Sequence, residues 1–122
     1  MRLVPLITVF VAGVAAASCG APTPSPEIDA GVPHIPCEVD ALLTARCRVC
    51  HDNPPAQNAP FPLVTQADFQ RPFGGSTVAE RTVGAVESDF MPLNATPLNS
   101  AEKTLLIGWL DAGVPLSTAN CN

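Results

Sequence analysis

One pentapeptide, Cys47-Arg48-Val49-Cys50-His51, constrains the fold of this chain more than any other feature. If the segment that ends there is helical, Cys47, Cys50 and His51 stand at positions i, i+3 and i+4 and project from one face. Two thiols and an imidazole then point in the same direction from the end of a helix. The fold therefore has to leave room on that face for whatever these three groups hold.

Two thiols followed directly by an imidazole, in the order C-x-x-C-H, are typical of the attachment of a c-type haem. The thiols of Cys47 and Cys50 can bond to the porphyrin vinyl groups, and His51 can bind the iron from below. A dithiol oxidoreductase normally carries its pair at the start of a helix after a strand, whereas this pair is expected to end a helix. A zinc site lacks a convincing fourth ligand. We therefore expect one covalently attached haem c as the cofactor.

The chain begins like an exported protein. Arg2 provides a positive charge, residues 3–14 are mostly apolar, and small residues precede Cys19, so residues 1–18 are expected to be a signal peptide. Cleavage before Cys19 makes this residue the lipid-modified first residue of a periplasmic, membrane-anchored lipoprotein. Cleavage after Ala17 instead leaves it as a stray thiol of a secreted protein. The apolar run is too short to span a bilayer as a mature helix.

Five cysteines are present, and the pentapeptide and the lipid site together use three of them. In an oxidising compartment the other two, Cys37 and Cys121, can pair. Such a disulfide ties the start of the folded domain to its last residues and closes a loop of about 85 residues, which stabilises a fold by several kcal/mol if the bond is unstrained.

The chain divides into a tether and one domain. Five prolines and few large apolar groups lie between residues 20 and 36, so residues 19–36 are expected to be an extended tether and residues 37–122 the folded domain. From Cys19 onward, five basic residues stand against eleven acidic ones, a formal charge of −6. This balance argues against nucleic acid and favours partner proteins with a basic docking patch, although solubility alone also accounts for it.

The domain has helical patterns and no alternating strand pattern. Residues 38–50 are expected to form a helix that the prolines after Asn53 end. Capping boxes at residues 65–68, 77–80 and 99–102 open three more. The expected fold is mostly α, with three to four short helices and long loops. The faces expected to be buried consist of Val39, Leu42, Leu43, Cys47 and Cys50 in the first helix, Val78, Thr82, Val83 and Val86 in the third, and Leu105, Leu106, Trp109 and Leu110 in the last.

A haem iron held by His51 has a second face. Met91 is the only methionine after the signal peptide and lies 40 residues beyond His51, in a loop closed by Pro92. A thioether favours ferrous iron, so Met91 is expected to be the distal ligand; without a haem it would be a gap-filling core residue. The rival ligand, His34, requires the tether to fold back, and we expect it to be a solvated linker residue.

With these features the chain resembles a small bacterial monohaem cytochrome c. The stretch from Cys47 to His51 resembles the haem attachment site of that family, Met91-Pro92 its distal ligand loop, and residues 99–113 its C-terminal helix, which crosses the N-terminal one. The resemblance implies helices and loops wrapped around one haem. It also implies that a prolyl carbonyl, of Pro60 or Pro62, accepts the Nδ1 proton of His51. The chain departs from the simplest members in its signal, tether and paired cysteines and in having no tyrosine.

Two functions stay open. The first is a one-electron carrier that cycles Fe(III)/Fe(II) haem between redox partner proteins and is not an enzyme, because six iron ligands leave no place for a substrate. The alternative is a haem enzyme, or a sensor of gas or peroxide, which needs Met91 to be absent from the iron or easily displaced.

Overall fold

The computed structural model describes residues 31–121. The predicted signal peptide, Cys19 and most of the tether lie outside the described residues, and the predictions for them stay predictions. Within residues 31–121, no helix is both long and apolar enough to cross a membrane.

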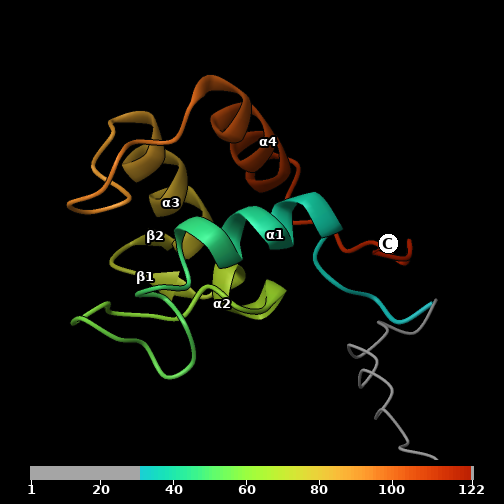
Figure 1. The fold of residues 1–122 in the computed structure, drawn as a ribbon. Coiled ribbons are helices and arrows are strands. Elements are labelled where there is room, and N and C mark those ends of the chain that lie inside the picture. Colours follow the sequence, from blue (N-terminus) through green and yellow to red (C-terminus); the bar gives the residue numbers. More distant parts are fainter. Residues whose placement is uncertain (1–30, 122) are drawn as a thin grey trace, which may run out of the picture.

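Four helices and one short hairpin make up the described part of the chain. They are, in order, α1 (Cys37–Arg46), α2 (Gln66–Gln70), β1 (Pro72–Phe73), β2 (Ser76–Thr77), α3 (Val78–Glu87) and α4 (Ser100–Asp111). In Figure 1, α3 and α4 lie above α1, α2 lies below it, and the hairpin lies toward its left-hand end. Helix α4 packs against both α1 and α3, and α2 packs against α3. The prediction of a mostly α fold with short helices and long loops is confirmed.

The three predicted capping boxes are all present. In each, the N-cap side chain accepts a hydrogen bond from the backbone N–H of the residue three positions later. The carboxylate of that later residue accepts a hydrogen bond from the N-cap N–H in return. In the second box, the backbone N–H and the hydroxyl of Thr77 lower the pKa of Glu80. The pairs are Thr65 with Asp68, Thr77 with Glu80, and Asn99 with Glu102.

The hairpin was not predicted, because strands of two residues are too short to show an alternating pattern. Pro72 pairs with Thr77 and Phe73 with Ser76. Gly74 and Gly75 form the two-residue turn between the strands, with φ of 60° and 89°. A type I′ hairpin turn requires this left-handed conformation at both of its central residues.

The core lies where α1, α3 and α4 meet, and Phe69 of α2 joins it. The rings of Phe69 and Trp109 meet edge to face with their centroids 5.0 Å apart. Most of the predicted buried positions are confirmed, but Leu105 is 37% exposed and that prediction is wrong. Cys47, Cys50 and Val83 are only partly buried. The buried members of the three predicted faces are Val39, Leu42, Leu43, Val78, Thr82, Val86, Leu106, Trp109 and Leu110.

The two ends of the domain are joined. Cys37 and Cys121, 84 residues apart, form the predicted disulfide with their Cα atoms 5.3 Å apart. His34 exchanges two backbone hydrogen bonds with Ser117, of 2.9 and 2.8 Å, and Ile35 is buried in the core. The prediction that His34 is a solvated linker residue is therefore wrong, and the packed part of the chain begins a few residues before Cys37.

Candidate functional site

The pentapeptide lies in a tight turn after α1. The helix was predicted to continue to Cys50, but it ends at Arg46, and residues 47–50 form turns. The N–H of Arg48 donates to the carbonyl of Leu43, five residues back, at 2.9 Å, which breaks the helical register. The N–H of His51 then donates to the carbonyl of Cys47 at 2.9 Å, so the three groups still share one helix-like turn.

The His51 ring is buried, with 7% of the residue exposed, and its orientation is defined. Nδ1 lies 2.8 Å from the carbonyl oxygen of Phe61. Because a carbonyl only accepts, Nδ1 carries the proton, and the lone pair of Nε2 is left for a metal. Within residues 31–121, the hydrogen bond of the His51 side chain is the one at Nδ1, and Nε2 is not among the buried atoms left without a partner, so this nitrogen keeps access to solvent. The acceptor is the residue between Pro60 and Pro62, so the prediction of a prolyl carbonyl is wrong.

The segment after the acceptor is also fixed to His51. The N–H of Leu63 donates to the carbonyl of His51 at 2.8 Å. The Phe61 ring lies against the imidazole, with ring centroids 5.3 Å apart. Phe73 of the hairpin meets the Phe61 ring edge to face, with centroids 5.0 Å apart. The hairpin thus supports the segment that orients the histidine.

Among residues 31–121, neither thiol of the pentapeptide has a disulfide partner, and both are partly buried. Burial raises the pKa of the Cys47 thiol to about 11, and the nearby guanidinium groups of Arg46 and Arg48 offset this only in part. A redox dithiol acts as the thiolate, so burial of the Cys47 thiol does not provide the lowered pKa that is typical of that use of the motif.

Met91 follows α3 in the long loop that leads to α4, and it is partly buried. Its N–H donates to the carbonyl of Ala85 at 3.0 Å, which fixes the start of the loop. Lys103 binds Asp89 at 2.6 Å, and Nη2 of Arg46 donates to the carbonyl of Thr96 at 2.5 Å. The loop is thus held from both of its ends by the helices beneath it.

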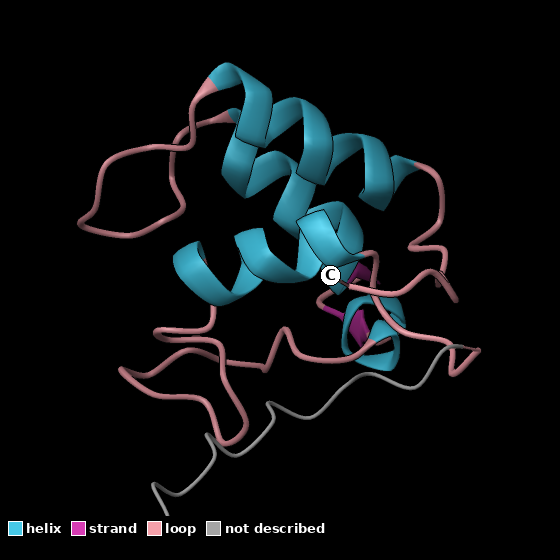
Figure 2. Ribbon diagram, turned by 45° about the vertical axis from the view of Figure 1, so that its right-hand side comes forward, coloured by secondary structure: helices cyan, strands magenta, loops and turns pink. Residues whose placement is uncertain are grey.

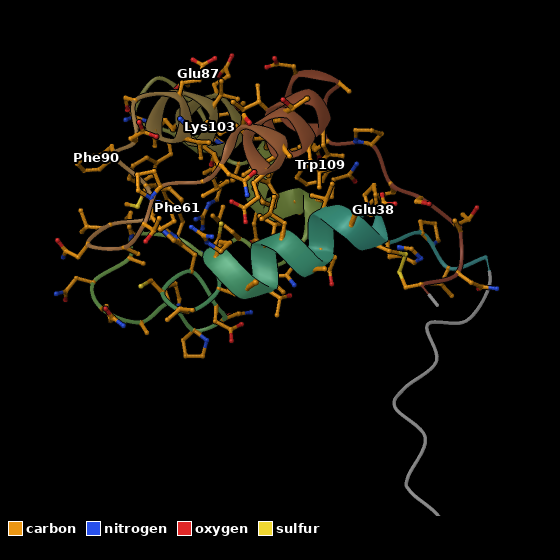
Figure 3. All side chains as sticks on the ribbon, turned by 45° about the horizontal axis from the view of Figure 1, so that its top comes forward. Glu38, Phe61, Glu87, Phe90, Lys103 and Trp109 are labelled. Atoms are coloured by element: carbon orange, nitrogen blue, oxygen red, sulfur yellow. A yellow bond between two sulfur atoms is a disulfide. The ribbon has the colours of Figure 1, made fainter. Side chains whose placement is uncertain are left out.

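The loops that carry His51 and Met91 extend from the same end of the molecule. In Figures 1 and 2 both project beyond the end of α1 that leads into the pentapeptide. Figure 3 shows Phe61 and Phe90, one from each loop, on that same side. Among the described residues no hydrogen bond or ring contact joins Met91 to His51, so their pairing on one iron stays a prediction.

Large apolar side chains flank both predicted ligands and are exposed. Val49 lies within the pentapeptide and is 66% exposed, while Phe90 and Leu93 beside Met91 are 61% and 57% exposed. These side chains make the two loops a candidate surface for a ligand or partner.

A second group of ligand-type residues lies at the opposite end of the domain. His34, Cys37 and Cys121 bring their ligand atoms within 4.8 Å of one another. The two sulfurs are bonded to each other and the His34 Nε2 lies 2.8 Å from the Ala119 carbonyl, so the group is not a metal site in this state. A cavity of about 340 Å³ beside it is lined by His34 and Asp40 among others and contains no residue of the pentapeptide.

No protein-family model matches this chain, and it has no match among curated proteins or among solved structures. The site therefore has to be interpreted from its own geometry. Two of its features were not predicted from the sequence: the Phe61 carbonyl, whose role depends on backbone position, and the hydrogen bonds that the Arg48 guanidinium donates to the Leu63 and Val64 carbonyls, Asp40 and Thr44. The two prolines around Phe61 were the only sequence signal for the first.

Proposed function

We propose that the protein is a one-electron carrier of the cytochrome c type. In this proposal the thiols of Cys47 and Cys50 hold one haem c covalently, and His51 and Met91 are the axial ligands of its iron. The observation that carries the proposal is the ring of His51, whose Nδ1 donates to the Phe61 carbonyl while Nε2 makes no hydrogen bond within residues 31–121. An imidazole held in this way is prepared to be a metal ligand, and it follows directly on a pair of free thiols.

A bound haem c supplies Fe(III)/Fe(II) chemistry, and the protein residues determine how it is used. Two thioether bonds prevent loss of the group. Buried His51 holds the proximal side rigidly. The Met91 thioether, a neutral and soft ligand, favours the ferrous state and raises the reduction potential. With both axial positions filled by side chains, the protein transfers electrons and does not bind a substrate at iron.

The surroundings of the thiols are compatible with a porphyrin. A flat apolar group between the two loops would cover side chains that are otherwise exposed, among them Val49, Phe90 and Leu93. Short helices with long loops are the architecture expected of a cytochrome c-like fold, in which the cofactor is part of the core.

Location and partners are part of the same proposal. A signal peptide followed by Cys19 would deliver the chain to a bacterial periplasm and anchor it to a membrane through a lipid on that residue. The acidic mature chain would be steered toward redox partner proteins that carry a basic docking patch.

The test is expression of the full chain together with a haem-attachment machinery. We expect a mass increment of one haem, both thiols of the pentapeptide blocked to alkylation, and a sharp α band in the reduced spectrum at the position typical of c-type haem. The oxidised protein should also have a methionine-to-iron charge-transfer band. A colourless exported protein with both thiols free contradicts the proposal. A haem protein that lacks this band and binds carbon monoxide rapidly supports the alternative of an enzyme or sensor.

A further inference from the structure

We propose that Arg48, a variable position of the pentapeptide, is a positioning residue for His51. Its guanidinium holds the segment at residues 63–64 against α1 and thereby holds the Phe61 carbonyl in place. This inference rests on the proposed function, because the orientation of His51 matters through the iron that it would bind.

The guanidinium of Arg48 joins two parts of the chain. On the loop side, Nε donates to the carbonyl of Leu63 at 3.1 Å and Nη2 to that of Val64 at 3.2 Å. On the helix side, Nη2 donates to Asp40 at 2.7 Å and Nη1 to the Thr44 hydroxyl at 2.8 Å. Only 13% of the Arg48 side chain is exposed, so the guanidinium is largely shielded, although the Asp40 side chain is 42% exposed. A rigid planar fork with several donors is what such a set of acceptors requires.

The loop that Arg48 holds is the one that orients His51. Leu63 is fixed from two sides: its carbonyl accepts from Arg48, and its N–H donates to the His51 carbonyl at 2.8 Å. The Phe61 carbonyl lies two residues earlier and accepts the Nδ1 proton. Prolines on both sides of Phe61 have no N–H to donate, so this stretch depends on outside contacts for its position.

The neighbouring arginine has a different task. Arg46 donates to Glu102 at 3.2 Å and to the Thr96 and Pro97 carbonyls, at the end of the loop that carries Met91. None of its contacts reaches residues 61–64. Arg48 is therefore the arginine of this turn that acts on the proximal side.

The hydrogen bond at Nδ1 makes the imidazole a stronger donor to a metal. A stronger donor stabilises Fe(III), so loosening the Phe61 carbonyl is expected to raise the midpoint potential. Loss of a positive charge acts in the opposite direction, because it favours the oxidised state. A substitution that keeps the charge but not the fork separates the two effects.

The experiment compares Arg48→Lys and Thr44→Val with the unchanged full chain. Lysine keeps the charge but cannot reach all four acceptors, and Thr44→Val removes one of them without any change of charge. We expect an upward shift of the midpoint potential in both, larger in Arg48→Lys, and faster hydrogen exchange at the Leu63 amide. Arg71→Lys is the matched control, since the Arg71 side chain makes no hydrogen bond within the described residues. It should leave both quantities unchanged.

Unchanged potential and unchanged Leu63 exchange in Arg48→Lys overturn the inference, as does a potential that falls. If Arg48→Lys does not fold, the midpoint potential of Thr44→Val decides: an upward shift supports the inference, and an unchanged or lower potential overturns it. If the protein proves to carry no haem, the proposed function fails by itself. Leu63 exchange and the ¹⁵N shift of His51 Nδ1 then still decide whether Arg48 holds the loop, because both are read without iron.

Discussion

The residues of the candidate site differ in how far their positions depend on the folding of distant parts of the chain. Cys47, Cys50 and His51 are adjacent along the chain, so one turn of backbone brings them together. Met91 comes from a separate loop and reaches the same end of the domain only because α3 and α4 return there. Met91, the proposed distal ligand, is therefore the residue whose role would depend most on the folded state.

Substitution of Met91 by alanine tests this role. We expect Met91→Ala to remove the charge-transfer band of the oxidised protein, to lower the midpoint potential and to permit carbon monoxide binding, because the thioether that favours ferrous iron is gone. Absorption spectra and redox titration measure all three. Leu93→Ala, an exposed neighbour in the same loop, is the control and should keep the band. A Met91→Ala protein that keeps the band excludes Met91 as the ligand.

At the level of elements, helix starts were predictable and one helix end was not. The capping boxes of α2, α3 and α4 need only residues three apart, so their presence in the sequence sufficed. At the end of α1 the Arg48 N–H donates to the Leu43 carbonyl, and the Arg48 side chain binds carbonyls fifteen and sixteen residues away, contacts that a local pattern does not contain. The hairpin between α2 and α3 was missed for a different reason, since its strands contain two residues each.

The last capping box provides a prediction at this scale. The Asn99 side chain accepts from the Glu102 N–H at 2.9 Å, so Asn99→Ala leaves that donor at the start of α4 without its partner. We expect the free energy of unfolding to fall by about 1 kcal/mol. Urea denaturation measures the difference. Ser100→Ala is the matched control, because the Ser100 side chain makes no hydrogen bond in the described part of the chain. Equal stability of the two variants would count against the cap.

At the scale of the whole molecule, the disulfide and the candidate site occupy opposite ends. Figure 1 shows the C-terminal segment and the start of α1 together, away from the two site loops. The Cys37–Cys121 bond closes almost the entire domain, and His34 adds its backbone pairing with Ser117 beside it. This closure compensates for a small core without contributing a group to the site.

Removal of the disulfide should therefore separate stability from function. The variant Cys37→Ala/Cys121→Ala is expected to lose about 4 kcal/mol of stability, because a long loop is no longer closed in the unfolded chain. Its midpoint potential and charge-transfer band should stay unchanged. Chemical denaturation measures the loss of stability, and redox titration and absorption spectroscopy measure the midpoint potential and the charge-transfer band. As a control, with the haem kept ferrous throughout, a disulfide reductant should destabilise the original protein and leave the stability of the variant unchanged. A changed spectrum in the folded variant would show that the two ends are coupled.

What the sequence determined alone is the set of features that few neighbouring residues define: the order of two thiols and an imidazole, the three capped helix starts and the cysteines left to pair. What only the tertiary structure decided is which carbonyl faces His51, where α1 ends, that His34 packs against the C-terminal segment and that Leu105 is exposed. The reason is physical. A local pattern is repeated wherever its residues occur, whereas a contact between distant segments forms only after the chain has brought them together.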